Sequence, residues 1–142
     1  MATILIIDDQ KPIRALLRRA LEGANHEVLE ASNGRLGLEL YRERLAELVI
    51  TDIFMPEMNG LEMMLELNRT FPEVKVIVMS GGLESEGALN VAKQLGARQT
   101  FQKPLDIETL LNAVRYELAS TRQDDDSFGL RSRGRWLEPE AN

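Results

Sequence analysis

Short apolar runs alternate with longer segments of helical periodicity along this sequence, and this alternation constrains the fold more than any other feature. Three runs consist mainly of branched apolar residues, as expected for buried central strands: Ile4–Ile7, Leu48–Thr51 and Val74–Met79. Two runs mix polar and apolar residues, as expected for edge strands: Glu27–Ala31 and Arg98–Gln102. We therefore predict an α/β fold, with a five-stranded parallel sheet of flavodoxin-like order 2-1-3-4-5 and helices on both faces.

Five segments between and after these runs carry the apolar stripe of an amphipathic helix. The stripes are Ile13, Leu16, Leu17, Ala20 and Leu21; Leu38, Tyr41 and Leu45; Leu61, Met64 and Leu65; Ala88, Val91, Ala92 and Leu95; and Ile107, Leu110, Leu111, Val114 and Leu118. Pro12 and Gly23 are typical of the start and end of the first helix. Asn59 and Asp106 are expected to cap the third and fifth helices, and Gly96 to end the fourth.

The chain has 142 residues, which fits a single domain, and its lack of cysteine excludes disulfides, thiolate metal sites and a cysteine nucleophile. Helical periodicity ends near Thr121, and few apolar residues follow that could offset the entropy of ordering. We predict a folded domain over residues 1–120 and a mobile C-terminal tail over residues 121–142. That tail is too short for a DNA-binding or catalytic output domain.

The net charge of -6 is unfavourable for general binding to the phosphate backbone of nucleic acids, so we expect no direct DNA binding. The first apolar run, Ile4–Ile7, stops at two aspartates and is too short for a signal sequence or a membrane span. We therefore expect no membrane association and a cytoplasmic location.

Polar side chains follow four of the predicted strands, at the point where each strand ends. Asp8 and Asp9 follow the first strand, Asp52 the third, Ser80 the fourth and Lys103 the fifth. In an open parallel sheet, ligands bind outside the carboxyl ends of the strands, where the strand order reverses. The sequence therefore predicts one cleft that holds three carboxylates, a hydroxyl and an ammonium group.

Three carboxylates at close range repel one another unless a cation offsets their charge. Mg²⁺ suits this role, because it takes oxygen ligands and is usually held by one or two carboxylates together with phosphate oxygens. Lys103 adds a second positive charge, and the Ser80 hydroxyl can donate to a phosphoryl oxygen. We predict that this set stabilises in-line phosphoryl transfer to Asp52, since such transfer depends mainly on positioning and charge neutralisation.

Ordered motifs around these residues identify a resemblance to a known family. They are Ile7-Asp8-Asp9, the string from Thr51 to Gly60 (TDIFMPEMNG), Ser80 after an apolar strand, Gly96-Ala97, and Lys103-Pro104. Over residues 3–120 the sequence resembles the receiver domains of two-component signalling, including single-domain chemotaxis response regulators. The resemblance implies that Asp52 accepts a phosphoryl group from a histidine kinase or a small phosphodonor. Such a domain catalyses only its own phosphorylation and dephosphorylation.

The resemblance also implies a ligand set and a backbone feature. Mg²⁺ is expected to bind Asp9 and Asp52 directly, Asp8 through water, and the backbone carbonyl of Phe54. A cis peptide bond before Pro104 is expected to aim Lys103 into the site. The signal is expected to leave through protein–protein contacts, with a histidine kinase or phosphotransfer protein upstream and the protein a monomer or a weak phosphorylation-dependent dimer.

Two positions depart from the usual family pattern. Thr100 stands where an aromatic switch residue is common, and strand alternation turns the neighbouring Phe101 to the other face of the sheet, into the core. Phe54, two residues after the acceptor, is bulky enough to shield an acyl phosphate from water. We therefore predict slow self-dephosphorylation, and the route by which the signal leaves the domain stays open because Thr100 replaces the usual ring.

Three other functions fit parts of this pattern less well. A pseudo-receiver that acts as a binding module usually lacks the acceptor, the acid pair or the lysine, all of which are present. A haloacid-dehalogenase-like phosphatase carries a second aspartate two residues after its nucleophile, where this chain has Phe54. A nucleotide-binding flavodoxin-like protein needs a phosphate-binding loop that the sequence does not contain. A phosphorelay intermediate stays open as an alternative to a stand-alone regulator.

Overall fold

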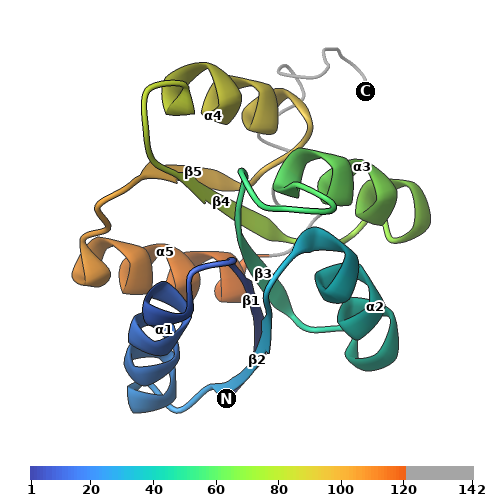
Figure 1. Cartoon of the computed structure of the whole chain (residues 1–142). Coiled ribbons are helices and arrows are strands. Elements are labelled where there is room, and N and C mark those ends of the chain that lie inside the picture. Colours follow the sequence, from blue (N-terminus) through green and yellow to red (C-terminus); the bar gives the residue numbers. More distant parts are fainter. Residues whose placement is uncertain (121–142) are drawn as a thin grey trace, which may run out of the picture.

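A computed structural model of the chain describes residues 1–120, in which five parallel strands form one sheet (Figure 1). The strands are β1 (Thr3–Ile7), β2 (Glu27–Ala31), β3 (Leu48–Asp52), β4 (Val76–Ser80) and β5 (Gln99–Gln102). Their order is β2-β1-β3-β4-β5, so the predicted fold class and topology are confirmed. The tail predicted over residues 121–142 lies outside the described residues.

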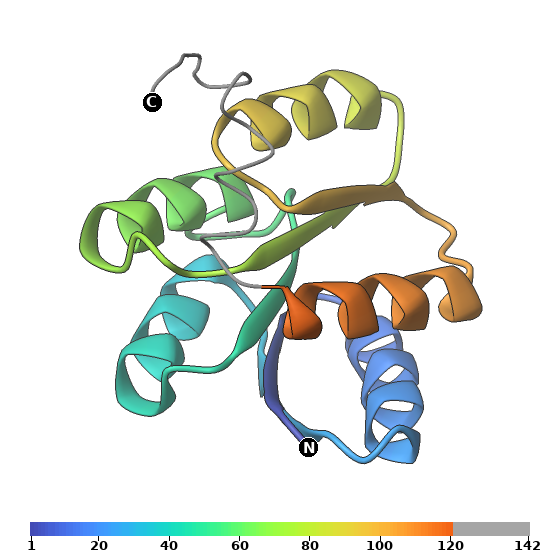
Figure 2. The same cartoon turned by 180° about the vertical axis from the view of Figure 1, so that it is seen from behind.

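Five helices cover the two faces of the sheet, as Figures 1 and 2 show from opposite sides. They are α1 (Lys11–Gly23), α2 (Gly34–Arg44), α3 (Gly60–Thr70), α4 (Ser85–Gln94) and α5 (Ile107–Ala119). Helices α1 and α5 pack on one face, and α2, α3 and α4 pack on the other. Within residues 1–120, no helix combines the length and the apolar composition needed to cross a bilayer.

Alternation along the strands divides the core into two clusters. Ile4 and Ile6 of β1 pack toward α1 and α5, whereas Leu5 and Ile7 pack toward the other three helices. All four side chains are fully buried. Because each central strand is covered on both faces, apolar residues fill most of its positions, and polar residues stand only near its ends.

Capping residues mark the starts of α3 and α5 and the end of α4. At the start of α3, the Asn59 side chain accepts from the Glu62 N–H and the Glu62 carboxylate accepts from the Asn59 N–H, which forms a capping box. Asp106 caps α5 by accepting from the Glu108 N–H. Gly96, with a φ of 105°, follows α4 in the left-handed region that favours glycine. These caps were predicted correctly.

Four members of the predicted apolar stripes do not lie in the core. Leu45 has left-handed backbone geometry at the end of α2 and is exposed, so the second stripe ends one turn earlier than predicted. Three others point away from the sheet and are substantially exposed: Leu16, Leu65 and Val91. Each lies at the margin of its stripe, where a change of one position turns the side chain by about 100°.

Candidate functional site

The carboxyl ends of the central strands bring three aspartates together. Asp8 and Asp9 follow β1, Asp52 ends β3, and one carboxylate oxygen of each lies within 4.8 Å of the other two. Asp8 is fully buried, Asp52 is 6% exposed, and Asp9 is open to solvent. Oxygen donors at this spacing, one of them facing water, can hold a hard divalent cation that keeps part of its hydration shell.

The side chain of Lys103 enters the same cluster from the end of β5. Its Nζ lies 3.0 Å from Oδ2 of Asp8 and 3.4 Å from Oδ2 of Asp52. The peptide bond between Lys103 and Pro104 is cis, as predicted, and the Lys103 N–H donates to the Ser80 carbonyl at 2.8 Å. The lysine is thus held at the junction of β4 and β5, where its charge offsets that of two carboxylates.

Both oxygens of the buried Asp8 carboxylate have a hydrogen-bond partner. Oδ1 accepts from the Gln10 N–H at 2.8 Å, which closes the turn between β1 and α1, and Oδ2 accepts from Lys103. A buried carboxylate with a hydrogen-bond partner at each oxygen keeps one orientation. Asp8 therefore supplies fixed negative charge behind the more exposed Asp9.

Burial raises the pKa of the Asp52 carboxyl above its ordinary range, and the Asp8 carboxylate raises it further. The Lys103 ammonium and the Ile53 N–H, which donates to Oδ1 of Asp52 at 2.8 Å, act in the opposite direction. Burial is the largest of these effects. The ionised carboxylate of Asp52 is therefore unfavourable in this environment. Binding of a cation beside it, or conversion of the carboxylate to a neutral group, relieves the cost.

The Ser80 hydroxyl is a buried polar atom for which the described residues offer no hydrogen-bond partner. The side chain is fully buried at the end of β4, beside Asp52 and Lys103 in the strand order. A buried hydroxyl without a partner is costly, so it commonly serves a ligand or a change of state. This hydroxyl fits a phosphoryl oxygen as its acceptor.

An open pocket of about 300 Å³ gives access to the cluster. Its walls are Asp9, Gln10, Asp52, Phe54, Gly81 and Lys103. Phe54 is 46% exposed, so its ring lies at the mouth and not in the core. A β-carbon on Gly81 would lie 3.1 Å from Cβ of Lys103, which means that the glycine leaves room for the lysine.

The departure from the family pattern at Thr100 has a structural counterpart in β5. Phe101 packs partly buried against the α1 and α5 side of the core, as strand alternation predicted, and so does not replace the missing ring at Thr100. Gln102 donates to the buried Ser85 hydroxyl at 2.7 Å, which ties β5 to the first turn of α4. The Arg14 guanidinium also donates to the backbone carbonyl of Asp8 at 2.7 Å. Neither contact was predicted, because nothing in a residue pattern marks either pair.

Replacing Asp52 with asparagine is expected to stabilise the metal-free protein at neutral pH. The folded state holds the Asp52 proton more tightly than the unfolded chain, because the pKa is raised. Stability from this group is therefore lost as the pH rises from about 4 through the raised pKa. In EDTA at pH 7, the unfolding temperature of Asp52→Asn should be higher than that of wild type. The difference between the two temperatures should become smaller toward pH 4. A less stable variant at pH 7 contradicts this reading of the site.

A doubly covered parallel sheet with an acidic pocket at its switch point defines a flavodoxin-like α/β protein that can bind a cation. The family model of the response regulator receiver domain matches residues 4–115. The chain therefore belongs to the response regulator receiver domain family, which confirms the resemblance found in the sequence.

Relatives of this chain include single-domain and multidomain proteins. Protein PilH of Pseudomonas aeruginosa is 36% identical over 122 residues, which cover 84% of this chain and 99% of PilH. The DNA-binding transcriptional regulator NtrC of Azospirillum brasilense is 34% identical over 119 residues. That match covers 84% of this chain but 24% of NtrC, so the chain spans about a quarter of that relative.

Among solved structures, the response regulator TrrA of Thermotoga maritima in complex with Mg²⁺-BeF superposes with a TM-score of 0.75 at 27% identity. The match covers 82% of this chain and 99% of TrrA. That relative was solved in complex with Mg²⁺-BeF, and this chain shares its fold.

Proposed function

We propose that this protein is a single-domain response regulator, in which Asp52 accepts a phosphoryl group in a Mg²⁺-dependent reaction. The observation that carries the proposal is the set of charges around Asp52. The Lys103 ammonium lies within 3.4 Å of Asp52, two further carboxylates lie within 4.8 Å, and the buried Ser80 hydroxyl has no partner among the described residues. Phosphoryl transfer needs this combination of an oxygen nucleophile, cations and free donors.

Asp8, Asp9 and Asp52 fit a magnesium ion, because their oxygens are hard donors and their combined charge exceeds what Lys103 offsets. Asp9 and Asp52 would bind the ion directly and Asp8 through water, with the Phe54 backbone carbonyl as a further ligand. When bound, Mg²⁺ neutralises charge on the phosphoryl oxygens and on the aspartates.

The chain's own residues have separate roles in the proposed transfer. An Asp52 carboxylate oxygen attacks phosphorus, a new P–O bond forms, and the bond from phosphorus to the donor's histidine nitrogen or acetate oxygen breaks, its electron pair leaving with the donor. Lys103 pairs with a phosphoryl oxygen, and the Ser80 hydroxyl donates to another. Transfer to Asp52, and later hydrolysis of the acyl phosphate, are the only reactions that we assign to the domain.

The phosphoryl group is expected to come from a histidine kinase, a phosphotransfer protein or a small phosphodonor in the cytoplasm. Residues 1–120 would form the receiver domain and signal through protein–protein contacts without binding DNA, as a monomer or a weak phosphorylation-dependent dimer. The wide mouth of the pocket supports access by a protein donor, since Asp9 and Phe54 are both exposed. Passing the group on to a second protein would make the chain a phosphorelay intermediate.

Intact mass spectrometry after treatment with acetyl phosphate and MgCl₂ tests this function. Wild type should gain one phosphoryl group, and EDTA should prevent the gain. No gain with acetyl phosphate and with a panel of histidine kinases would remove the phosphoacceptor function. A gain that persists in EDTA would remove the Mg²⁺ dependence alone.

Replacing Phe54 with asparagine is expected to speed the loss of the phosphoryl group. The aromatic ring lines the pocket beside Asp52, where it limits the approach of water, whereas an amide can hydrogen-bond a water molecule there. After acetyl phosphate is removed, intact mass measured over time should decay several-fold faster in Phe54→Asn. Equal decay rates would show that the ring does not shield the acyl phosphate.

A further inference from the structure

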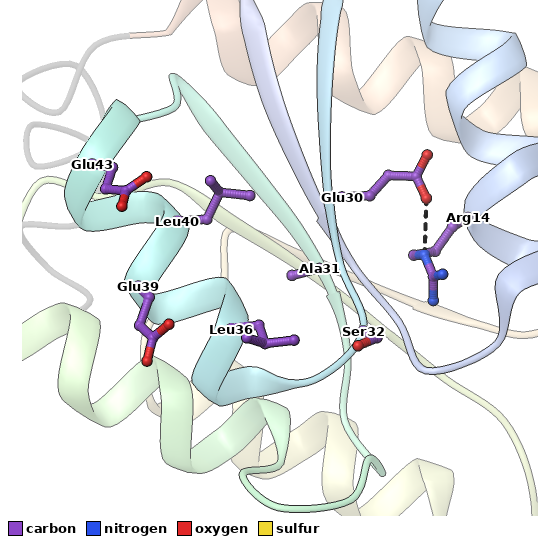
Figure 3. Close-up of a pocket in the computed structure, with 8 residues that line it drawn as sticks. All are labelled: Arg14, Glu30, Ala31, Ser32, Leu36, Glu39, Leu40 and Glu43. Carbon is purple, nitrogen blue, oxygen red and sulfur yellow. Dashed lines mark hydrogen bonds and ion pairs between the residues drawn. The ribbon is translucent and has the colours of Figure 1, made fainter.

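Arg14 of α1 makes two contacts that join the acidic turn to the neighbouring strand. Its Nη1 donates to the backbone carbonyl of Asp8 at 2.7 Å, and its Nε donates to a carboxylate oxygen of Glu30 in β2 at 2.9 Å. Figure 3 shows the side chain reaching from α1 toward Glu30. The Arg14 side chain is 16% exposed, so both contacts are partly shielded from water. A guanidinium suits this position because its donors point in fixed, separate directions.

The turn that carries the two aspartates has few other restraints. Gln10, the residue before α1, makes no side-chain cap, and the first turn of α1 has no acidic residue. The Asp8 N–H donates to the Ala31 carbonyl at 3.1 Å, and the Asp8 side chain closes the turn through the Gln10 N–H. Asp9 itself makes no hydrogen bond to any of the residues that the structure describes, so it is restrained only through its neighbours. The Asp8 carbonyl belongs to the peptide plane that leads into Asp9. When the Arg14 guanidinium donates to this carbonyl, it limits rotation of the whole peptide plane. The orientation of that plane sets the direction in which the Asp9 side chain leaves the backbone.

We propose that Arg14 is a positioning residue for the divalent cation: it fixes the peptide between Asp8 and Asp9, and so holds the Asp9 carboxylate toward Asp8 and Asp52. The inference rests on the proposed Mg²⁺ site and assigns a residue outside the ligand set. Groups that orient metal ligands commonly contribute about 10-fold to 100-fold in affinity. Glu30 in turn holds Arg14, so β2 supports a site at the end of β1.

The chain contains a matched control for this role. Arg18 lies one turn further along α1 and also pairs with Glu30, and it donates to the backbone carbonyl of Val28 at 3.2 Å. Like Arg14, it therefore contacts a glutamate and a backbone carbonyl, but within residues 1–120 it makes no hydrogen bond or ion pair with the acidic turn. Replacing either arginine with alanine removes one positive charge, one ion pair with Glu30 and one carbonyl contact. Arg18→Ala also removes an exposed ion pair with Glu22, which lies away from the acidic turn.

The Mg²⁺ dissociation constant, measured on the full chain, distinguishes the role of Arg14 from that of Arg18. Amide chemical shifts near Asp52, followed by NMR during a titration with MgCl₂ alone, should give a constant about tenfold higher in Arg14→Ala than in wild type. Arg18→Ala should stay within about twofold of wild type on the same scale. Unfolding temperatures in EDTA should fall in both, since each variant loses an ion pair with Glu30 and a carbonyl contact. Equal Mg²⁺ constants in the two variants would overturn the positioning role.

A conservative variant keeps the test decisive if Arg14→Ala does not fold. Arg14→Lys retains the charge and the apolar stem, but a single ammonium cannot hold the Asp8 carbonyl and Glu30 in the same geometry. Its Mg²⁺ constant should lie between those of wild type and Arg14→Ala, and a wild-type constant would overturn the inference. If wild type itself binds no Mg²⁺, the proposed metal site fails; if wild type binds and the arginine variants match it, the role of Arg14 alone fails.

Discussion

Replacing Gly60 with alanine is expected to destabilise the protein by about 3 kcal/mol or more, or to prevent folding. Gly60 begins α3 and its N–H donates to the Ile53 carbonyl at 2.8 Å. A β-carbon at this position would lie 2.2 Å from the Asp52 carbonyl oxygen and 3.1 Å from the Ile53 α-carbon. Both neighbours are backbone atoms and cannot rotate away. The start of α3 or the end of β3, which carries the proposed phosphoryl acceptor, would have to move.

Gly87→Ala provides the control, because Gly87 also lies in a helix and a β-carbon there would meet nothing within 4 Å. Alanine at an open helical position usually stabilises by up to about 1 kcal/mol relative to glycine. Urea unfolding should thus shift the midpoint down for Gly60→Ala and slightly up for Gly87→Ala. Equal midpoints for wild type and Gly60→Ala would mean that β3 and α3 are not packed as described.

Replacing Lys103 with methionine is expected to slow phosphorylation by about 100-fold. Methionine preserves much of the apolar stem but removes the ammonium that lies 3.0 Å from Asp8 and 3.4 Å from Asp52. The phosphoryl group then loses a fixed cation, and the fully buried Asp8 loses its ionic partner. Removing one partner of a buried pair is usually costly, so the unfolding temperature should fall as well.

Lys93→Met removes the same charge from an exposed position in the last turn of α4. The acidic site lies at the carboxyl ends of the strands, next to the chain that leads into the other end of this helix. Initial rates of phosphoryl gain from acetyl phosphate at saturating MgCl₂ should therefore be unchanged in Lys93→Met. A change in net charge alone would slow both variants equally. That result would contradict a specific role for Lys103.

Much of the fold could be predicted because burial on both faces leaves a direct mark on the sequence. The central strands need apolar residues at most positions, and the runs at Ile4–Ile7 and Leu48–Thr51 meet that need, with Thr51 as the one polar residue. The topology then determines that polar residues after those strands meet at one edge. Asp8 and Asp52 are close for that reason, although 44 positions separate them.

Other features depend on distances that a residue pattern does not contain. Leu16 and Leu65 are exposed because of the exact rotation of each helix about its axis. A small change in that rotation decides whether a side chain at the edge of the apolar stripe is buried or exposed. The Arg14 contact uses a backbone carbonyl, and every residue has one, so no acceptor stands out in the sequence. The unpartnered Ser80 hydroxyl likewise becomes evident only when its surroundings are known.

The proposed acceptor can be located directly by chemical trapping. After wild type and Asp52→Asn are treated with acetyl phosphate and MgCl₂, borohydride reduces an aspartyl phosphate to homoserine, which peptide mass spectrometry assigns to a position. We expect homoserine at position 52 of wild type and no phosphoryl gain in Asp52→Asn. Trapping at another residue of wild type, or an undiminished phosphoryl gain in Asp52→Asn, would contradict the assignment of Asp52 as the acceptor.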